Sequence, residues 1–183
     1  MKNTKSTLLF AAVITLLMLT GCSNNKENNN EPTTSDVVSF DEVLATRRSV
    51  RSYDASKTIS EAEVRELLIA TQEAPSWANM QPSKYYVAMS PEKVEAVSNL
   101  VGERNKLNIA GAPVLIVSTY EKGKSGFFCG EQTNEVGDGW GAYDYGLSNA
   151  YFILKARAKG FDTLIMGMRD SDALRTLFNI PEN

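Results

Sequence analysis

The chain has 183 residues, 43% of them hydrophobic and 22% charged, and a formal net charge of -3. These values fit one globular domain with an additional segment, and a weakly acidic chain is a poor candidate for binding nucleic acid. It has no histidine and two distant cysteines, Cys22 and Cys129. Histidine-based catalytic groups, histidine-ligated zinc and thiolate metal sites are therefore excluded. Any chemistry must come from a bound group or from carboxylates, lysine and tyrosine.

Residues 1–21 have the pattern of a secretory signal peptide. Lys2 and Lys5 precede an apolar run at 7–19, which is shorter than the roughly 20 residues that cross a membrane. The run ends in the letters LTGC at 19–22. This resembles the bacterial lipobox, in which the signal peptide is removed and the cysteine is acylated.

Cys22 is therefore predicted to be acylated and to anchor the protein in the cell envelope, facing outside the cytoplasm. An uncleaved membrane anchor is the alternative. Cleavage would remove the two lysines of the signal peptide and take the formal charge from -3 to -5. Residues 22–36 contain no large apolar side chain and are predicted to form a disordered tether in front of a domain at 37–183.

The domain is predicted to begin with two capped helices. Ser39 to Glu42 form a capping-box pattern that opens a helix with Phe40, Val43 and Leu44 on its inner face. A second capping box at 60–63 opens a helix that runs to about residue 73. A proline-bracketed loop at 74–82, with the letters APSWANMQP, follows this helix. Loops with so many specific polar groups tend to have a function.

Between the two helices, residues 47–51 read RRSVR. Three guanidinium groups and a hydroxyl within five residues have the composition of a phosphate-binding site, because arginine binds phosphate through a planar fork of donors. The structural alternative is that cations after a helix complement its dipole or form a solvated face.

The remaining elements alternate between strands and helices. Strands are predicted at 85–89, 113–118 and 161–166, and helices at 90 onward, 142–158 and 171–178. The glycine-rich stretch 121–139 is predicted to be a surface excursion. One face of the long helix is expected to consist of Tyr143, Leu147, Ala150, Tyr151 and Leu154.

The chain resembles the nitroreductase family over residues 40–181. The resemblance depends on the order of its motifs, which are RRSVR, APSWANMQP, the glycine-bounded helix and FDTLIMGMRD. The resemblance implies an α+β, nitroreductase-like FMN-binding fold with a central, mostly antiparallel sheet flanked by helices. It also implies an intertwined homodimer. The implied activity is an FMN-dependent oxidoreductase that reduces planar acceptors such as nitroaromatics and quinones by ping-pong hydride transfer, with NAD(P)H as the usual donor.

The resemblance also implies which positions contact FMN, with no further catalytic residue and no metal. The first run would bind the phosphate and the polar edge of the ring, the proline-bracketed loop would lie along the cofactor, and residues 164–167 would pack on the ring. The Gly167 amide would lie near the flavin O4 and N5. The positions are Arg47, Arg48, Ser49, Arg51, Pro75, Ser76, Asn79, Gln81, Leu164, Ile165, Met166 and Gly167.

Structural alternatives apply to several of these positions. Residues 164–166 also fit a simple core strand, Asn79 also fits a turn, and Trp77 also fits packing. Met166 stands where some relatives have a glutamate, which would alter substrate or donor preference.

The sequence departs from the family in two ways. Family members continue into a C-terminal segment that embraces the partner subunit, and this chain is expected to lack it. An exported protein would also encounter little NAD(P)H, so the sequence does not identify the reductant.

Two other functions are alternatives to the oxidoreductase. They are a non-catalytic lipoprotein that binds a ligand or partner, and a reductive dehalogenase. The dehalogenase would need a lid for a phenolic substrate, and residues 121–139 show no recognisable clamp.

Overall fold

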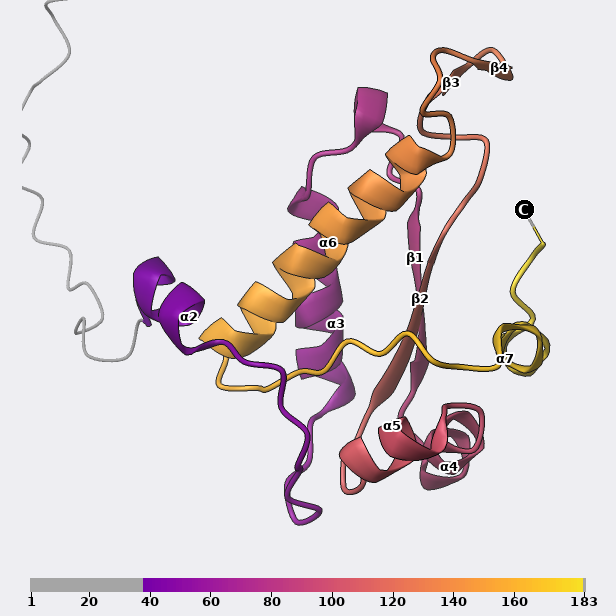
Figure 1. Ribbon diagram of the computed structural model, residues 1–183. Helices are drawn as coiled ribbons and strands as arrows, with labels where there is room; N and C mark the ends of the chain where they lie inside the picture. Colours follow the sequence, from indigo (N-terminus) through magenta and orange to yellow (C-terminus); the bar gives the residue numbers. More distant parts are fainter. Residues whose placement is uncertain (1–37, 183) are drawn as a thin grey trace, which may run out of the picture. The chain divides into compact units, whose positions relative to one another are not determined.

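A computed structural model describes residues 38–182 (Figure 1). The predicted signal peptide at 1–21 and the tether at 22–36, with Cys22, lie outside the described residues. Within 38–182, no helix combines the length and the hydropathy that crossing a membrane requires.

The two predicted capped helices are confirmed. Helix α2 spans Phe40–Thr46, and the Ser39 hydroxyl accepts a hydrogen bond from the Glu42 N–H. Helix α3 spans Glu61–Ala70 behind a complete Ser60–Glu63 capping box, and a 3-10 turn, η1 (Thr71–Glu73), continues it. These boundaries depend on local capping bonds, which is why the sequence pattern places them well.

The predicted inner face of α2 is only partly correct. Val43 is buried, whereas Phe40 is 66% exposed and Leu44 is 50% exposed. Helix α2 has seven residues and packs mainly against the long helix α6 (Gly139–Ala158), so it has too few neighbours in one copy of the chain to cover three apolar side chains.

A two-stranded antiparallel sheet lies between helices. Strands β1 (Ser83–Ala88) and β2 (Leu115–Tyr120) pair from Ser83↔Tyr120 to Ala88↔Leu115, close to the two predicted positions. Successive side chains point to opposite faces of a sheet. Tyr85 therefore faces α6, where its hydroxyl lies 2.7 Å from the Ser148 hydroxyl, and Ala88 faces the apolar core.

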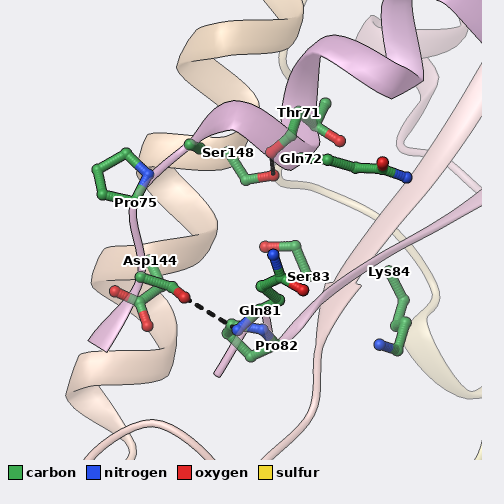
Figure 2. A pocket seen from close by; sticks show the side chains of 11 residues that line it. Thr71, Gln72, Pro75, Gln81, Pro82, Ser83, Lys84, Asp144 and Ser148 are labelled. Carbon is green, nitrogen blue, oxygen red and sulfur yellow. Dashed lines mark hydrogen bonds between the residues drawn. The ribbon is translucent and has the colours of Figure 1, made fainter. Parts of the chain in front are cut away.

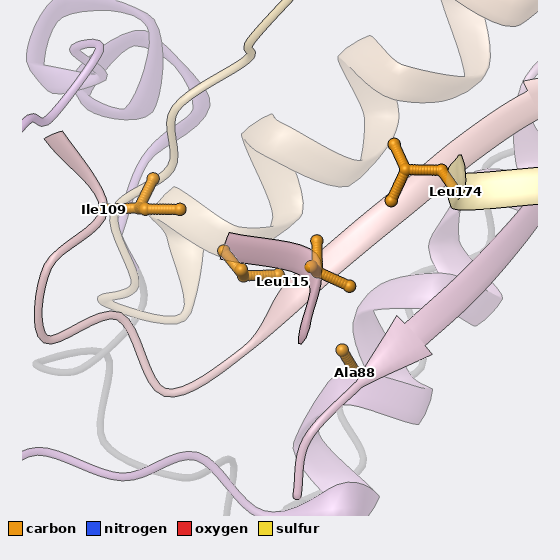
Figure 3. Packing of buried hydrophobic residues seen from close by; sticks show 5 residues of the cluster. Ala88, Ile109, Leu115 and Leu174 are labelled. Carbon is orange, nitrogen blue, oxygen red and sulfur yellow. The ribbon is translucent and has the colours of Figure 1, made fainter. Parts of the chain in front are cut away.

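The apolar core lies on the other face of this sheet. It includes residues of α4 (Pro91–Ser98) and α7 (Ser171–Phe178), and Ile109, which follows α5 (Glu103–Asn108). Figure 3 shows how its side chains converge. The buried members are Ala88, Val97, Ile109, Leu115 and Leu174.

The predicted third strand at 161–166 is wrong. The segment is extended, but in the described chain it forms only an isolated parallel bridge between Ser49 and Thr163. A strand needs a continuous neighbour for its backbone groups, and one N–H···O bond, from Val50 to Thr163, is present here.

The predicted excursion at 121–139 contains a short hairpin. Strands β3 (Phe127–Phe128) and β4 (Glu131–Gln132) are joined through Cys129 and Gly130, which both have positive φ values, 51° and 84°. Positive φ at both central residues is typical of a tight two-residue hairpin turn.

Helix α6 buries two polar side chains and exposes two tyrosines. Its buried residues are Gly141, Asp144, Ser148 and Ala156, while Tyr143 is 60% exposed and Tyr151 is 40% exposed. The predicted inner face is therefore wrong for both tyrosines. Polar side chains can be buried where they are hydrogen-bonded, and both Asp144 and Ser148 have such partners.

Candidate functional site

The arginine run lies beside the segment that contains residues 164–167. Arg47 ends α2, and its N–H donates to the Val43 carbonyl over 2.9 Å. Ser49 then pairs with Thr163 in parallel, and the Val50 N–H donates to the Thr163 carbonyl over 3.1 Å. Two of the three predicted site segments, more than a hundred residues apart in sequence, are thus neighbours.

The three arginines of this run have no acidic partner in the described chain. Arg47 is half-buried, and Arg48 and Arg51 are exposed. Arg48 and Arg51 donate to backbone carbonyls, of Arg47 at 2.7 Å and of Ser49 at 3.1 Å. None of the ion pairs among residues 38–182 includes any of the three. Their positive charge is available to an anion, and guanidinium groups bind phosphate well.

Residues 164–167 divide between core and surface. Leu164 and Met166 pack against the apolar core, as a core segment would, although the segment is not a strand. Ile165 is 69% exposed, and Gly167 is exposed with no atom within 4 Å of where a Cβ would lie. Any contact of Leu164 or Met166 with a ligand would therefore involve the backbone, whereas Ile165 can offer its side chain.

The loop at 74–82 has an unusual backbone. It contains the 3-10 turn η2 (Trp77–Asn79), and three non-glycine residues have positive φ: Ala78 at 45°, Asn79 at 57° and Gln81 at 48°. Asparagine tolerates this conformation, but alanine has no side chain to stabilise it, at a cost of about 1 kcal/mol or more. Backbone strain of this kind is frequent at functional sites.

A cavity of about 330 Å³ lies between this loop, the 3-10 turn η1, the start of β1 and α6 (Figure 2). It brings Pro75, Ser76 and Gln81 together with residues of α6, but not Asn79. Its full lining is Thr71, Gln72, Ala74, Pro75, Ser76, Gln81, Pro82, Ser83, Lys84, Asp144 and Ser148.

Asp144 is a residue of this region that the sequence patterns missed. It is 3% exposed, and its Oδ2 accepts a hydrogen bond from the Trp77 N–H over 2.9 Å. One feature of the sequence could have indicated this residue, because Asp144 is the only acidic residue between Gly139 and Ala158.

The loop and the arginine run lie near opposite ends of α6 (Figure 1). Asp144 holds the loop near the helix N-terminus, while near the C-terminus the Arg157 Nε donates to Thr46, which directly precedes the arginine run, over 3.0 Å. Asp144 and Arg157 are thirteen positions apart along the helix, which corresponds to a rise of about 20 Å. One copy of the chain therefore does not bring all three predicted segments together.

These features occur in a chain that belongs to the nitroreductase family, whose model matches residues 44–183. The predicted family and α+β fold are thus confirmed. A protein of Bacillus subtilis (strain 168), provisionally named NAD(P)H nitroreductase YdgI, is 27% identical over 169 residues, which covers 77% of this chain and 80% of the relative.

Solved structures show the same fold. A provisionally named nitroreductase from Exiguobacterium sibiricum 255-15, in complex with FMN, has a TM-score of 0.69 at 24% identity, covering 82% of this chain and 85% of that chain. The enone reductase CLA-ER, from a gut-bacterial fatty acid saturation metabolism, has a TM-score of 0.69 at 18% identity, covering 84% and 83%.

Proposed function

We propose that this chain is an FMN-dependent oxidoreductase that reduces planar electron acceptors such as nitroaromatics and quinones. The observation that carries the proposal is the pairing of Ser49 with Thr163, because it places arginines without acidic partners beside the outward-facing residues Ile165 and Gly167. The family of the chain and the FMN complex of the Exiguobacterium relative support this choice of ligand.

The residues present fit the chemical groups of FMN. Arg47, Arg48 and Arg51, with the Ser49 hydroxyl, can bind a phosphate through charged and neutral hydrogen bonds. The Ile165 side chain offers an apolar contact for a ring, and the Gly167 N–H, which donates to no group in the described chain, offers a hydrogen bond to its polar edge.

Bound FMN would supply the hydride chemistry that this histidine-free chain lacks, accepting a hydride from a donor and passing it to an acceptor. The protein would bind and orient the cofactor, and its fixed positive charges would favour negative charge on it. A flat acceptor suits a site that is open on one face. NAD(P)H is the donor in the name of the Bacillus relative, and a protein outside the cytoplasm would need another reductant.

A second copy of the chain would complete the site. The outward face of α6 exposes Tyr143 and Tyr151 although the helix buries Asp144 and Ser148. Apolar surface that faces outward while polar groups face inward is typical of an interface in a homodimer. In such a dimer, the loop at 74–82 of one copy would meet the arginine run of the other.

The proposed location is the cell envelope, with acylated Cys22 as the anchor. The support is the signal-peptide pattern and the LTGC letters at 19–22. Cys22→Ser is expected to move the protein from the membrane fraction to the soluble fraction, because the lipid attachment is lost. Unchanged membrane fractionation of the variant would contradict this part of the proposal.

The function is tested by the visible absorption spectrum of the full chain, purified in detergent with FMN added and excess removed. A flavin spectrum that bleaches with a chemical reductant and returns on adding a quinone or nitroaromatic is expected. A bound flavin that neither acceptor reoxidises would contradict these substrates. A protein that retains no FMN would contradict the proposal and favour a non-catalytic binding protein on this fold.

A further inference from the structure

Asp144 has a buried carboxyl group. It is 3% exposed on the inner side of α6, and in the part of the chain that the structure describes no lysine or arginine forms an ion pair with it. A buried polar group is unfavourable unless it is hydrogen-bonded. The partner of Asp144 is the Trp77 N–H, 67 positions away in sequence.

This hydrogen bond acts at the start of the left-handed turn. Ala78 and Asn79 follow Trp77 directly, with φ values of 45° and 57°. The Ser76 hydroxyl accepts a second bond, from the Gln81 N–H at 2.9 Å, but Ser76 belongs to the loop itself. Asp144 therefore joins the strained turn to helix α6. The joined residue, Trp77, directly precedes Ala78, which of the residues in this turn is least suited to left-handed backbone.

We propose that Asp144 is a positioning residue of the site: by holding the Trp77 amide, it keeps residues 78–81 in the turn that presents Asn79 and Gln81 outward. Both of those side chains are exposed. The consequence for FMN rests on the proposed function, whereas the consequence for the loop does not.

Trp77 reports on the loop directly. The chain has two tryptophans, so a Trp140→Phe background leaves Trp77 as the only one. In that background Asp144→Ala is expected to shift the Trp77 emission and to weaken FMN binding about tenfold, because the Trp77 N–H is left without its acceptor. Asp144→Asn keeps an acceptor oxygen and is expected to remain within about threefold of the parent.

A second substitution separates positioning from general packing. Ala78→Gly removes the Cβ that disfavours left-handed backbone, so the turn then depends less on its tether. In that background the loss of FMN affinity from Asp144→Ala is expected to shrink to about threefold or less. An equal loss in both backgrounds would overturn the proposal. Asp144→Ser, whose hydroxyl is too short to reach the amide, replaces Asp144→Ala if that variant does not fold.

Tyr85→Phe is the matched control, since it removes a partly buried hydrogen bond to α6 one turn beyond Asp144 and Tyr85 does not line the cavity. It is expected to leave the Trp77 emission and the FMN affinity unchanged. Equal effects of Tyr85→Phe and Asp144→Ala would show a general loosening of α6 and overturn the positioning role. If the parent binds no FMN, the proposed function fails, while the Trp77 emission still decides whether Asp144 holds the loop.

Discussion

Arg47, Arg48 and Arg51 are three cations within five residues, and none of them has a carboxylate partner in the described chain, whereas two other arginines do. Arg157 pairs with Asp162 at 3.1 Å and Arg65 with Glu61 at 3.4 Å. Like charges within five residues repel one another, and a bound phosphate would remove that repulsion. The affinity of this segment for an anion should therefore decrease as salt screens the charges.

Arg47→Ala is expected to weaken FMN binding by about 2 kcal/mol, because a charge-assisted contact to phosphate is lost. A flavin fluorescence titration at fixed salt measures the change. Arg65→Ala is the control, since Arg65 lies on exposed helix surface and its ion pair is solvated. An Arg47→Ala chain with parental affinity would remove Arg47 from the site.

At the scale of single residues, the sequence predicts which side chains have suitable chemistry better than it predicts which side chains are buried. The arginine run and the polar loop are visible in the letters themselves, and the structure places the run on the surface beside residues 164–167. Asp144 could not be recognised in the same way, because a buried carboxylate and an exposed one look alike in a helix. Its role depends on Trp77, 67 positions away.

At the scale of elements, local signals were reliable and non-local ones were not. The Ser60–Glu63 capping box places α3 correctly because both partners lie within one turn. The segment 161–166 has strand-like residues but lacks the neighbouring strand that would complete a ladder. The inward side of α6 depends on what packs against it, and hydroxyl groups of β1 and β2 provide partners that hydrophobic periodicity does not reveal.

Helix α6 crosses the sheet closely at Gly141. A Cβ at this position would lie 2.7 Å from the ring of Tyr120. Gly141→Ala is therefore expected to lower the free energy of unfolding by about 1–3 kcal/mol through overpacking, despite the better helix propensity of alanine. Chemical denaturation measures this value. Adding Tyr120→Leu should recover part of the loss, and a Gly141→Ala chain more stable than the parent would contradict the close crossing.

Tyr85 couples β1 to α6 and makes stability depend on alkaline pH. Burial raises the pKa of Tyr85 above its ordinary value of 10.0. The unfolded chain therefore loses this proton first, so the contribution to stability is complete below about pH 10 and decreases as pH rises toward the folded-state pKa.

Tyr85→Phe is expected to cost about 1 kcal/mol at neutral pH, because the hydrogen bond to Ser148 is lost. It should also reduce the fall in unfolding free energy above pH 10. Denaturation curves of parent and variant at pH 8 and pH 10.5 test both effects. Parallel pH dependences of the two proteins would show that Tyr85 does not supply the alkaline sensitivity.

At the scale of the whole molecule, the separation of the loop and the arginine run along α6 is the central feature. The two segments lie about 20 Å apart along one helix, and the face of α6 between them exposes Tyr143 and Tyr151. The proposed homodimer would cover this face, and it would account for the outward tyrosines, the exposed Phe40 and Leu44 of α2, and the divided site together.

The most direct test mixes two variants of the full chain. One carries Arg47→Ala and Arg51→Ala, and the other carries Asn79→Glu, which places a negative charge beside the bound anion. Each alone should retain little FMN. After unfolding and refolding together, about a quarter of the parental flavin should be bound, since half of the dimers are mixed and each mixed dimer has one intact site. No recovery on mixing, or full binding by the Asn79→Glu chain alone, would contradict a site built from two copies.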